Sequence, residues 1–392
     1  MSDIKIPLSE PCIGGNEWRY IKDCLDSGWV SSVGKYVDKF EDQLAAYVGT
    51  KYAVACVNGT AALHISLLIS GVGLHDEVLV PTLTFIAPVN TIKYVGAEPV
   101  FMDCDDYLNI DVGKVEQFIK NECVFKKGQL INKRSKRSVK AIIPVHIFGS
   151  PVDMNALIGL AKKYNLTIIE DATESLGSFF VNGKFKNKMT GAVGQIGCFS
   201  FNGNKIITTG GGGMLVTNDP QLAKKARYLT TQAKDSAIKY IHNEIGYNYR
   251  LTNVQAAMGV AQLERLSAYI KIKRKNFKLY EQMLGEIDGL QMINEPDYAS
   301  SNFWFYSLII DAKIYGKTNF ELMKALNNHG IQARPLWYLN HKQKPYKKNQ
   351  SYKIEKAEKY YNQVLNLPCS INLSEKDIKR VVGVIQKYAK KQ

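Results

Sequence analysis

Residues 198–219 read CFSFNGNKIITTGGGGMLVTND and place one lysine, Lys205, between a strand-like segment and four consecutive glycines. A phosphate-binding P-loop needs its glycines before the lysine and a Ser or Thr directly after it. Here Ile206 follows the lysine and the glycines come later, so the stretch is not a P-loop. Because glycine is costly in ordered structure, the run at 210–213 indicates that the backbone passes close to another group.

The chain around this stretch alternates between short apolar runs and helical patterns. Strands are predicted at 52–59, 77–81, 98–103, 139–149, 166–172, 196–201 and 213–219. Capped helical patterns lie between them, at 60–71, 151–165 and 219–232. This alternation predicts an α/β fold with a largely parallel sheet between helices. After about residue 253 long helices and the strand-like NFWFYSLIID (302–311) follow, which predicts a large domain at 1–252 and a smaller α+β domain at 253–392.

Length and composition are those of a soluble globular protein. The 392 residues suit two domains, and 45% hydrophobic with 22% charged residues is ordinary. No apolar run reaches the roughly 18 residues of a membrane span, and the N-terminus has no apolar signal core. Seven cysteines without a C-x-x-C pair indicate reduced thiols, and the six histidines show no metal-ligand spacing. We therefore expect a cytoplasmic protein with no membrane span and no metal site.

The net charge of +15 comes largely from two stretches, at 125–140 and 340–356. Neither carries a known nucleic-acid-binding module or interleaves aromatic with basic residues as a stacking platform does. The stretches are interpreted as solvated surface, or as a basic rim that attracts a small anionic substrate. No nucleic-acid partner is expected.

Polar residues follow several of the predicted strands, at the sheet edge where ligands gather in open α/β folds. Asn58-Gly59-Thr60 opens a helix, where free N–H groups and the helix dipole favour an anion; an ordinary capped turn is the alternative. Asp171 ends an apolar strand, and its carboxylate needs a cation or strong donors, although a helix N-cap would also suit it. Lys205 is either a surface loop residue or, if partly desolvated, an amine able to form a Schiff base. With an aromatic ring, these groups make up the set that pyridoxal 5′-phosphate requires.

Eight blocks of the sequence resemble the DegT/DnrJ/EryC1/StrS sugar aminotransferases, a branch of the fold-type I pyridoxal-phosphate enzymes. They lie at 27–49, 58–68, 81–103, 144–154, 168–178, 199–214, 246–259 and 333–341, and span nearly the whole chain. The resemblance implies a large domain with a mostly parallel seven-stranded sheet between helices, followed by a smaller α+β domain. It also implies pyridoxal phosphate as the cofactor, alternating with its pyridoxamine form.

The resemblance assigns roles around this cofactor. Lys205 would bind it covalently and shuttle the proton, Asp171 would pair with its pyridine nitrogen, and Phe85 would stack on its ring, unless Phe85 is a plain core residue. Glu174 would lie near its phenolic oxygen. The phosphate would be held by Gly59, Thr60 and Ser200.

Three further residues are implied to act outside this set. Asn248 would reach the phosphate of the neighbouring subunit's cofactor, which implies a homodimer with shared active sites. Arg334 and His341 would line the sugar-nucleotide side, with a surface role in the C-terminal domain as the alternative.

The run of four glycines differs from the G-E-G-G of many relatives. It resembles the subgroup that acts on UDP-linked 4-keto-6-deoxy-N-acetylhexosamines, on routes to legionaminic-type or bacillosamine-like glycans, with L-glutamate as the amino donor. The same reaction on a GDP- or dTDP-linked 4-ketosugar, of perosamine or O-antigen type, is the alternative. A sugar dehydratase of this fold is disfavoured, because those relatives carry histidine in place of the lysine. A regulator that binds nucleic acid is the non-enzymatic alternative.

Overall fold

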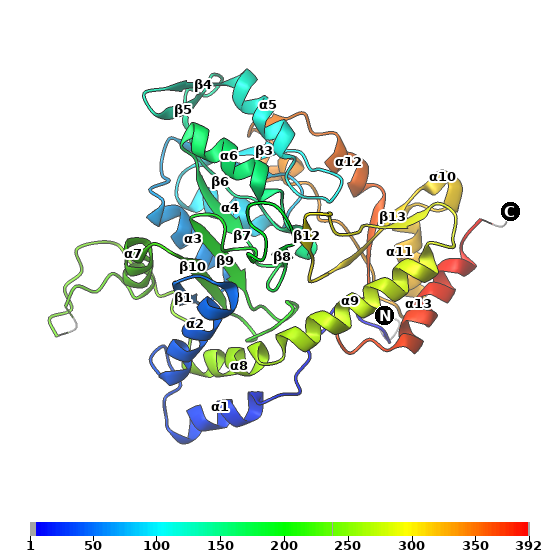
Figure 1. Ribbon diagram of the computed structural model, residues 1–392, viewed down its shortest axis with the longest axis horizontal. Helices are drawn as coiled ribbons and strands as arrows, with labels where there is room; N and C mark the ends of the chain where they lie inside the picture. The colour runs from blue at the N-terminus through cyan, green and yellow to red at the C-terminus, as the bar shows by residue number, and fades with distance from the viewer. Residues whose placement is uncertain (1–4, 237, 391–392) are drawn as a thin grey trace.

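A sheet of seven main strands forms the centre of the computed structural model, which describes residues 5–236 and 238–390 (Figure 1). In sheet order the strands are β1 (Tyr52–Cys56), β10 (Gly213–Thr217), β9 (Ile196–Ser200), β7 (Thr167–Asp171), β6 (Ser138–Ile142), β2 (Asp76–Pro81) and β3 (Glu98–Met102). Neighbours pair in parallel, except that β10 is antiparallel to both β1 and β9. The predicted α/β class with a mostly parallel sheet is confirmed, and each of the seven predicted runs contains one of these strands.

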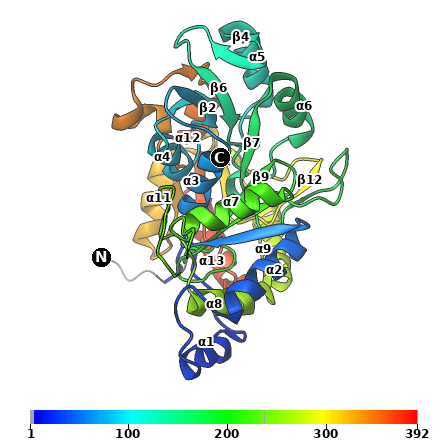
Figure 2. The same cartoon turned by 90° about the vertical axis from the view of Figure 1, so that its left-hand side faces the viewer.

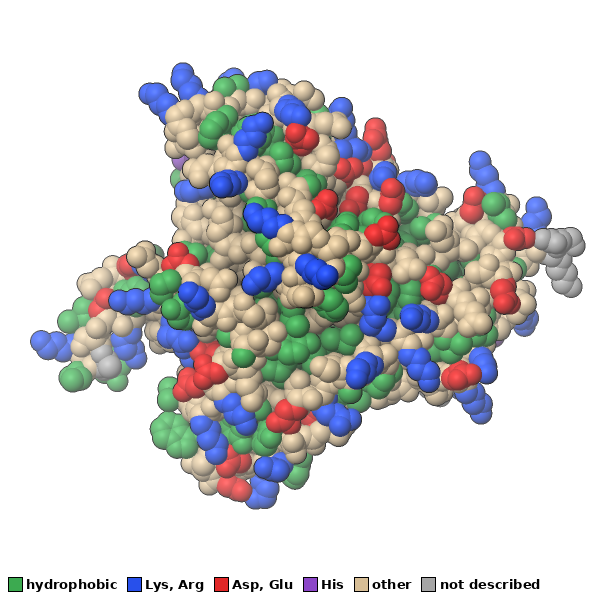
Figure 3. Space-filling model, in the orientation of Figure 1, with side chains coloured by type: hydrophobic (Ala, Val, Ile, Leu, Met, Phe, Trp, Pro, Cys, Tyr) green, Lys and Arg blue, Asp and Glu red, His purple; other side chains and the backbone are tan. Residues whose placement is uncertain are grey.

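Three short strands also belong to this sheet, of which β15 extends its edge beyond β3. β15 (Ser351–Tyr352) runs parallel to β3, while β4 (Cys123–Lys126) and β5 (Gln129–Asn132) form a hairpin that is antiparallel to β6. Most of this hairpin lies in the basic stretch at 125–140, and no strand is predicted at 123–132. The exposed lysine and arginine side chains of the basic stretch lie over the upper part of the molecule in Figure 3.

Helices cover both faces of the sheet (Figures 1 and 2). Along β1, Val54 and Cys56 belong to a core shared with α3, α4 and α7, whereas Ala53 and Ala55 belong to the core shared with α2 and α8. The strands are therefore buried on both sides, which is why they appear in the sequence as continuous apolar runs. The helices of this part are α1 (Glu17–Asp26), α2 (Lys35–Val48), α3 (Gly59–Ile69), α4 (Ile86–Tyr94), α5 (Val112–Glu122), α6 (Met154–Tyr164) and α7 (Pro220–Thr230).

A second, antiparallel sheet lies beside the first. Its order is β11 (Leu290–Met292), β13 (Tyr306–Ile310), β16 (Val364–Leu367) and β14 (Arg334–Pro335), while β8 (Phe179–Phe180) pairs with β12 (Ala299–Ser300). The remaining helices are α8 (Asn253–Leu263), α9 (Leu266–Leu284), α10 (Ala312–Tyr315), α11 (Asn319–Asn328), α12 (Lys356–Tyr361) and α13 (Glu375–Lys387). Within the described ranges, no helix has both the length and the apolar content that crossing a bilayer requires.

Helix α8 begins at a capping box on Thr252 but packs against α1 and α2, which lie in the first part of the chain. Helix α9 then extends to the second sheet, where it contacts β11 and α13 (Figure 1). The domain boundary at 252/253 stays a prediction.

The glycine run allows β10 to pass close to the loop between β1 and α3. A Cβ on Gly213 would lie 2.4 Å from the carbonyl carbon and oxygen of Asn58, and a Cβ on Gly212 would lie 2.3 Å from Thr209 Oγ1. Gly210 adopts a left-handed φ of +77°, which side chains disfavour. The group that the glycine run was predicted to approach is therefore the protein's own backbone, at Asn58.

Replacing Gly213 with alanine is expected to lower the free energy of unfolding by about 1–3 kcal/mol, because the added methyl group has no space against Asn58. Denaturant titration measures the change. Gly383→Ala in α13 is the control, since its Cβ meets nothing within 4 Å and alanine favours a helix by up to about 1 kcal/mol. Equal stability of the two variants would contradict the packing argument.

Candidate active site

A cavity of about 750 Å³ lies at the carboxyl ends of the parallel strands. Loops that follow β1, β2, β7 and β9 line one part of it, and the segments around β13 and β14 line the rest. Eight of the residues predicted from the sequence lie in its wall, namely Gly59, Thr60, Phe85, Asp171, Glu174, Ser200, Lys205 and Arg334. The topology brings together side chains separated by up to 275 positions in the sequence.

The start of α3 forms one end of the cavity. The Asn58 side chain caps the helix by accepting a hydrogen bond from the N–H of Ala61 at 2.7 Å. The N–H groups of Gly59 and Thr60 open the helix and have no acceptor within it. A Cβ on Gly59 would lie 2.8 Å from the Cβ of Ser200, so the glycine lets the helix start pack against that serine. Two free amides, a hydroxyl and the positive helix end are groups that favour the binding of an anion.

Asp171 ends β7 with its side chain in the cavity wall and is only 3% exposed. Its Oδ1 accepts a hydrogen bond from the N–H of Thr173 at 3.1 Å. Burial raises the pKa of Asp171 above its ordinary value, because the charged carboxylate is removed from water. A cationic group of a ligand beside it would offset this cost.

Glu174 and Lys205 lie next to each other in the same wall. Glu174 Oε2 accepts a hydrogen bond from the N–H of Phe148 at 2.8 Å, and Oε1 lies 3.5 Å from Lys205 Nζ. Burial raises the pKa of Glu174 to about 7, despite the neighbouring ammonium. Glu174 can therefore change protonation state near neutral pH.

This raised pKa predicts a pH-dependent stability in the ligand-free protein. Between pH 4.5 and 7 the unfolded chain releases the Glu174 proton while the folded chain retains it, so the free energy of unfolding should fall as pH rises. The glutamine in Glu174→Gln does not titrate. The free energy of unfolding of the wild type should therefore fall relative to that of this variant between pH 5 and 7. Above about pH 8 the difference between the two proteins should stay constant. Urea unfolding of both proteins across this range measures the difference. A difference that is independent of pH would contradict the prediction.

Aromatic side chains form another part of the wall. Phe85 is 52% exposed and lies 5.9 Å from Trp337 between ring centroids. Lys205 Nζ lies 4.0 Å from the centroid of Trp304. The sequence predictions missed both tryptophans. The aromatic run at 303–306 was visible as a strand-like segment, but its spacing does not show that Trp304 reaches a lysine a hundred positions earlier.

Asn248 and His341, which the sequence predicted as site residues, lie outside the cavity wall, and so does His146. Asn248 is exposed beside a separate depression of about 420 Å³, which Arg227 and Arg250 also line. His341 Nδ1 lies 2.6 Å from Thr82 Oγ1. His146 is fully buried and pairs with Glu170 at 2.9 Å. The roles expected for Asn248 and His341 stay predictions.

The cavity fits pyridoxal phosphate in four respects. The free amides of α3 suit its phosphate, and the buried carboxyl of Asp171 suits a protonated pyridine nitrogen. The exposed ring of Phe85 offers an apolar face, and Lys205 offers an amine. All four groups lie in the wall of the same cavity, so one small ligand can contact all of them.

Comparisons with known proteins agree with this fit. The model of the DegT/DnrJ/EryC1/StrS aminotransferase family matches residues 11–386. A GDP-perosamine synthase of Caulobacter vibrioides is 38% identical over 390 residues, which cover 98% of this chain and 99% of that protein. A GDP-perosamine synthase of Escherichia coli O157:H7 is 38% identical over 385 residues, which cover 98% of each chain. The crystal structure of a DegT DnrJ EryC1 StrS aminotransferase from Brucella abortus superposes with a TM-score of 0.86 at 30% identity, over 96% of each chain. The chain therefore belongs to the DegT/DnrJ/EryC1/StrS aminotransferase family and is a pyridoxal-phosphate-dependent sugar-nucleotide aminotransferase.

Proposed function

We propose that this enzyme transfers an amino group from L-glutamate to C4 of a GDP-linked 4-keto-6-deoxysugar. The observation that carries the proposal is the 38% identity, over nearly the full length, to two GDP-perosamine synthases. The all-glycine segment led us to expect a UDP-linked N-acetylhexosamine, but similarity over the whole chain outweighs one short segment. The GDP-linked substrate is therefore preferred to the UDP-linked one.

The proposed roles of the side chains follow from their surroundings. Lys205 holds the cofactor and moves the proton, since its amine lies in the cavity wall between Glu174 and Trp304. Asp171 keeps the pyridine nitrogen protonated, because a buried carboxylate favours a cation beside it. When bound, pyridoxal phosphate supplies an electron sink for the negative charge left at carbon when a proton is removed.

The remaining contacts position the cofactor. The amides of Gly59 and Thr60 with the Ser200 hydroxyl are proposed to bind the phosphate, and Phe85 is proposed to stack on the ring. Glu174 is proposed to face the phenolic oxygen, where a carboxyl with a pKa of about 7 can donate or accept a hydrogen bond.

A homodimer with shared active sites is part of the proposal. Asn248 is exposed beside the second depression rather than directed at the cavity of its own chain. This position supports a contact with the phosphate of the cofactor in a second copy of the chain.

Arg334 is proposed to bind the diphosphate of the sugar nucleotide. It is exposed at the cavity wall on β14, and a guanidinium matches phosphate oxygens in charge and geometry.

Arg334→Ala is expected to raise the KM for the nucleotide sugar by about 10- to 100-fold, the effect of losing a hydrogen bond to a charged group. The half-reaction with glutamate should change by less than about threefold, because glutamate carries no diphosphate. Steady-state and single-half-reaction kinetics measure the two effects. Arg19→Ala on α1 is the control for loss of one surface charge. Equal losses with both substrates would contradict a contact specific to the nucleotide sugar.

A spectroscopic titration tests the proposed reaction. Glutamate should bleach the visible absorption band of the enzyme-bound cofactor, and the amine form is then mixed separately with GDP-, UDP- and dTDP-linked 4-keto-6-deoxysugars. Recovery of the band with the GDP-linked sugar alone would support the proposal. Recovery with the UDP-linked N-acetyl sugar alone would restore the first expectation and overturn the GDP assignment. A band that glutamate never bleaches would overturn the proposed donor.

A further inference from the structure

The ammonium of Lys205 lies over the ring of Trp304 and beside the carboxylate of Glu174. Its Nζ lies 4.0 Å from the centroid of Trp304, whereas 3.5 Å to Glu174 Oε1 is at the outer limit of a hydrogen bond. A cation over the face of tryptophan is attracted most strongly where water is excluded. The Lys205 side chain is 13% exposed and Trp304 is 2% exposed, so this contact is largely desolvated.

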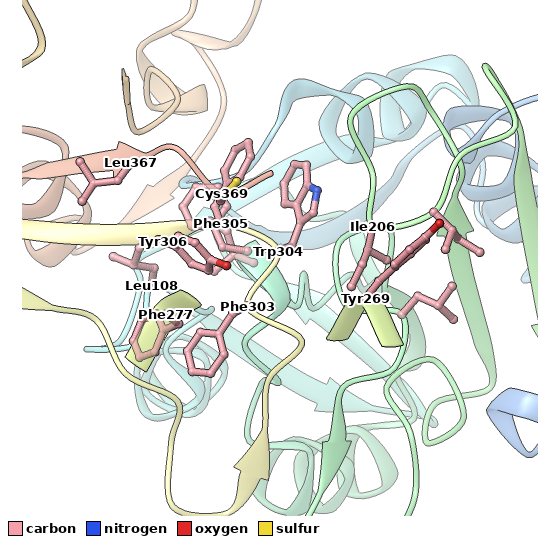
Figure 4. Close-up of a cluster of buried hydrophobic side chains, with 14 of the residues drawn as sticks. Leu108, Ile206, Tyr269, Phe277, Phe303, Trp304, Phe305, Tyr306, Leu367 and Cys369 are labelled. Carbon is pink, nitrogen blue, oxygen red and sulfur yellow. The ribbon is translucent and has the colours of Figure 1, made fainter. Parts of the chain in front are cut away.

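Trp304 is itself held on three sides. Its indole Nε1–H donates to the carbonyl of Asn204 at 2.8 Å, one residue before the lysine. Its backbone N–H donates to Asn302 Oδ1 at 2.8 Å, and its ring stacks on Phe305 at 4.0 Å with an interplanar angle of 11°. Figure 4 shows the ring between Phe305 and the segment that carries Ile206, with the indole nitrogen on the side of that segment. Trp304 is therefore held in place, and its ring offers a rigid surface to the flexible side chain of Lys205.

The segment that carries Trp304, residues 302–305, also anchors the loop that carries Glu174. Asn302 is fully buried, and its Nδ2 donates to the carbonyls of Glu174 and Leu176, each at 3.0 Å. Residues 302–305 lead into β13. They therefore contact both the loop that carries Lys205 and the loop that carries Glu174.

We propose that Trp304 is a positioning residue for Lys205. Its ring holds the ammonium of the unattached lysine at the cavity, and its N–H fixes the turn at 202–205. A lysine has four flexible carbons, and it loses much rotamer freedom when it is held in one place. The ring restricts that freedom before the cofactor arrives and each time the lysine is released. This inference rests on the proposed role of Lys205, but not on the identity of the sugar nucleotide.

The rate at which cofactor-free protein captures pyridoxal phosphate tests the proposal. Stopped-flow absorbance follows the appearance of the visible band, and borohydride reduction followed by peptide mass spectrometry gives the share of cofactor on Lys205. Trp304→Leu should slow capture by about tenfold and shift label to surface lysines, because it removes the ring. Trp304→Phe keeps a ring but not the N–H, and should remain within about threefold of wild type. Trp18→Leu, at a side chain 78% exposed on α1, is the control.

Each outcome bears on the proposal. If Trp304→Leu captures pyridoxal phosphate at the wild-type rate, the proposal is overturned. If capture is normal and only the KM for the nucleotide sugar is raised, Trp304 is a contact of the substrate and the proposal is overturned as well. If Trp304→Leu does not fold, as judged by circular dichroism, Trp304→Met replaces it as a longer, unbranched side chain without a ring. Failure of the wild type itself to label Lys205 would instead refute the role proposed for the lysine.

Discussion

Replacing Lys205 with arginine is expected to lower the turnover number by at least about 10⁴-fold, because one change removes both the proposed covalent attachment point and the proposed proton-transfer group. A guanidinium keeps the positive charge and the contact with Trp304, but it stays protonated and cannot form a Schiff base. The visible band of the bound cofactor should disappear as well. Turnover, absorbance and the mass of the borohydride-reduced protein measure these effects.

The control for this change is Lys376→Arg, an exposed lysine on α13. It should retain wild-type turnover and absorbance. A Lys205→Arg enzyme within tenfold of wild type would refute the assignment, and Lys205 would then be an ordinary loop residue.

Asp171→Asn is expected to lower turnover by about 10²- to 10⁴-fold, equivalent to the roughly 3–5 kcal/mol lost when one member of a buried charge pair is removed. The amide has nearly the shape of the carboxyl but no charge to keep a pyridine nitrogen protonated. The variant should still bind the phosphate end, because Gly59 and Thr60 are unchanged. Single-turnover kinetics and the position of the absorption band measure the effect.

Asp153→Asn tests the simpler explanation that Asp171 is an N-cap. Asp153 caps α6 by accepting from the N–H of Ala156, and asparagine is an equally good cap. This variant should keep both its stability and its turnover. If Asp171→Asn behaves in the same way, the role of Asp171 is structural.

The sheet was predictable because its strands are buried on both faces. Strands such as β2 and β7 therefore appear as short apolar runs that polar residues end or directly follow, and their order along the chain predicts a common edge. The hairpin of β4 and β5 was not predictable in this way. Only Cys123, Leu130 and Asn132 of its residues are buried, so its lysine-rich sequence has the pattern of solvated loop.

The cavity was predictable where a residue ends a strand, as Asp171 and Ser200 do. Trp304 and Trp337 reach it from the second sheet, and the position of that sheet depends on packing that no local pattern records. His341 was predicted as a site residue but does not line the cavity. It lies in a block that resembles the family, yet its side chain contacts Thr82 outside the cavity wall.

The antiparallel strand β10 imposes an order on the synthesis of this protein. β1 pairs along its full length with β10, through partners such as Tyr52 with Thr217, and about 160 residues separate the two strands. At roughly 5–20 residues per second, a ribosome needs roughly 8–30 s to add them. During that time β1 lacks its partner strand and remains a template for pairing with other chains. The nascent chain is therefore most vulnerable to aggregation before residue 217 leaves the ribosome, and holdase chaperones that bind it in this interval would raise the yield of folded enzyme.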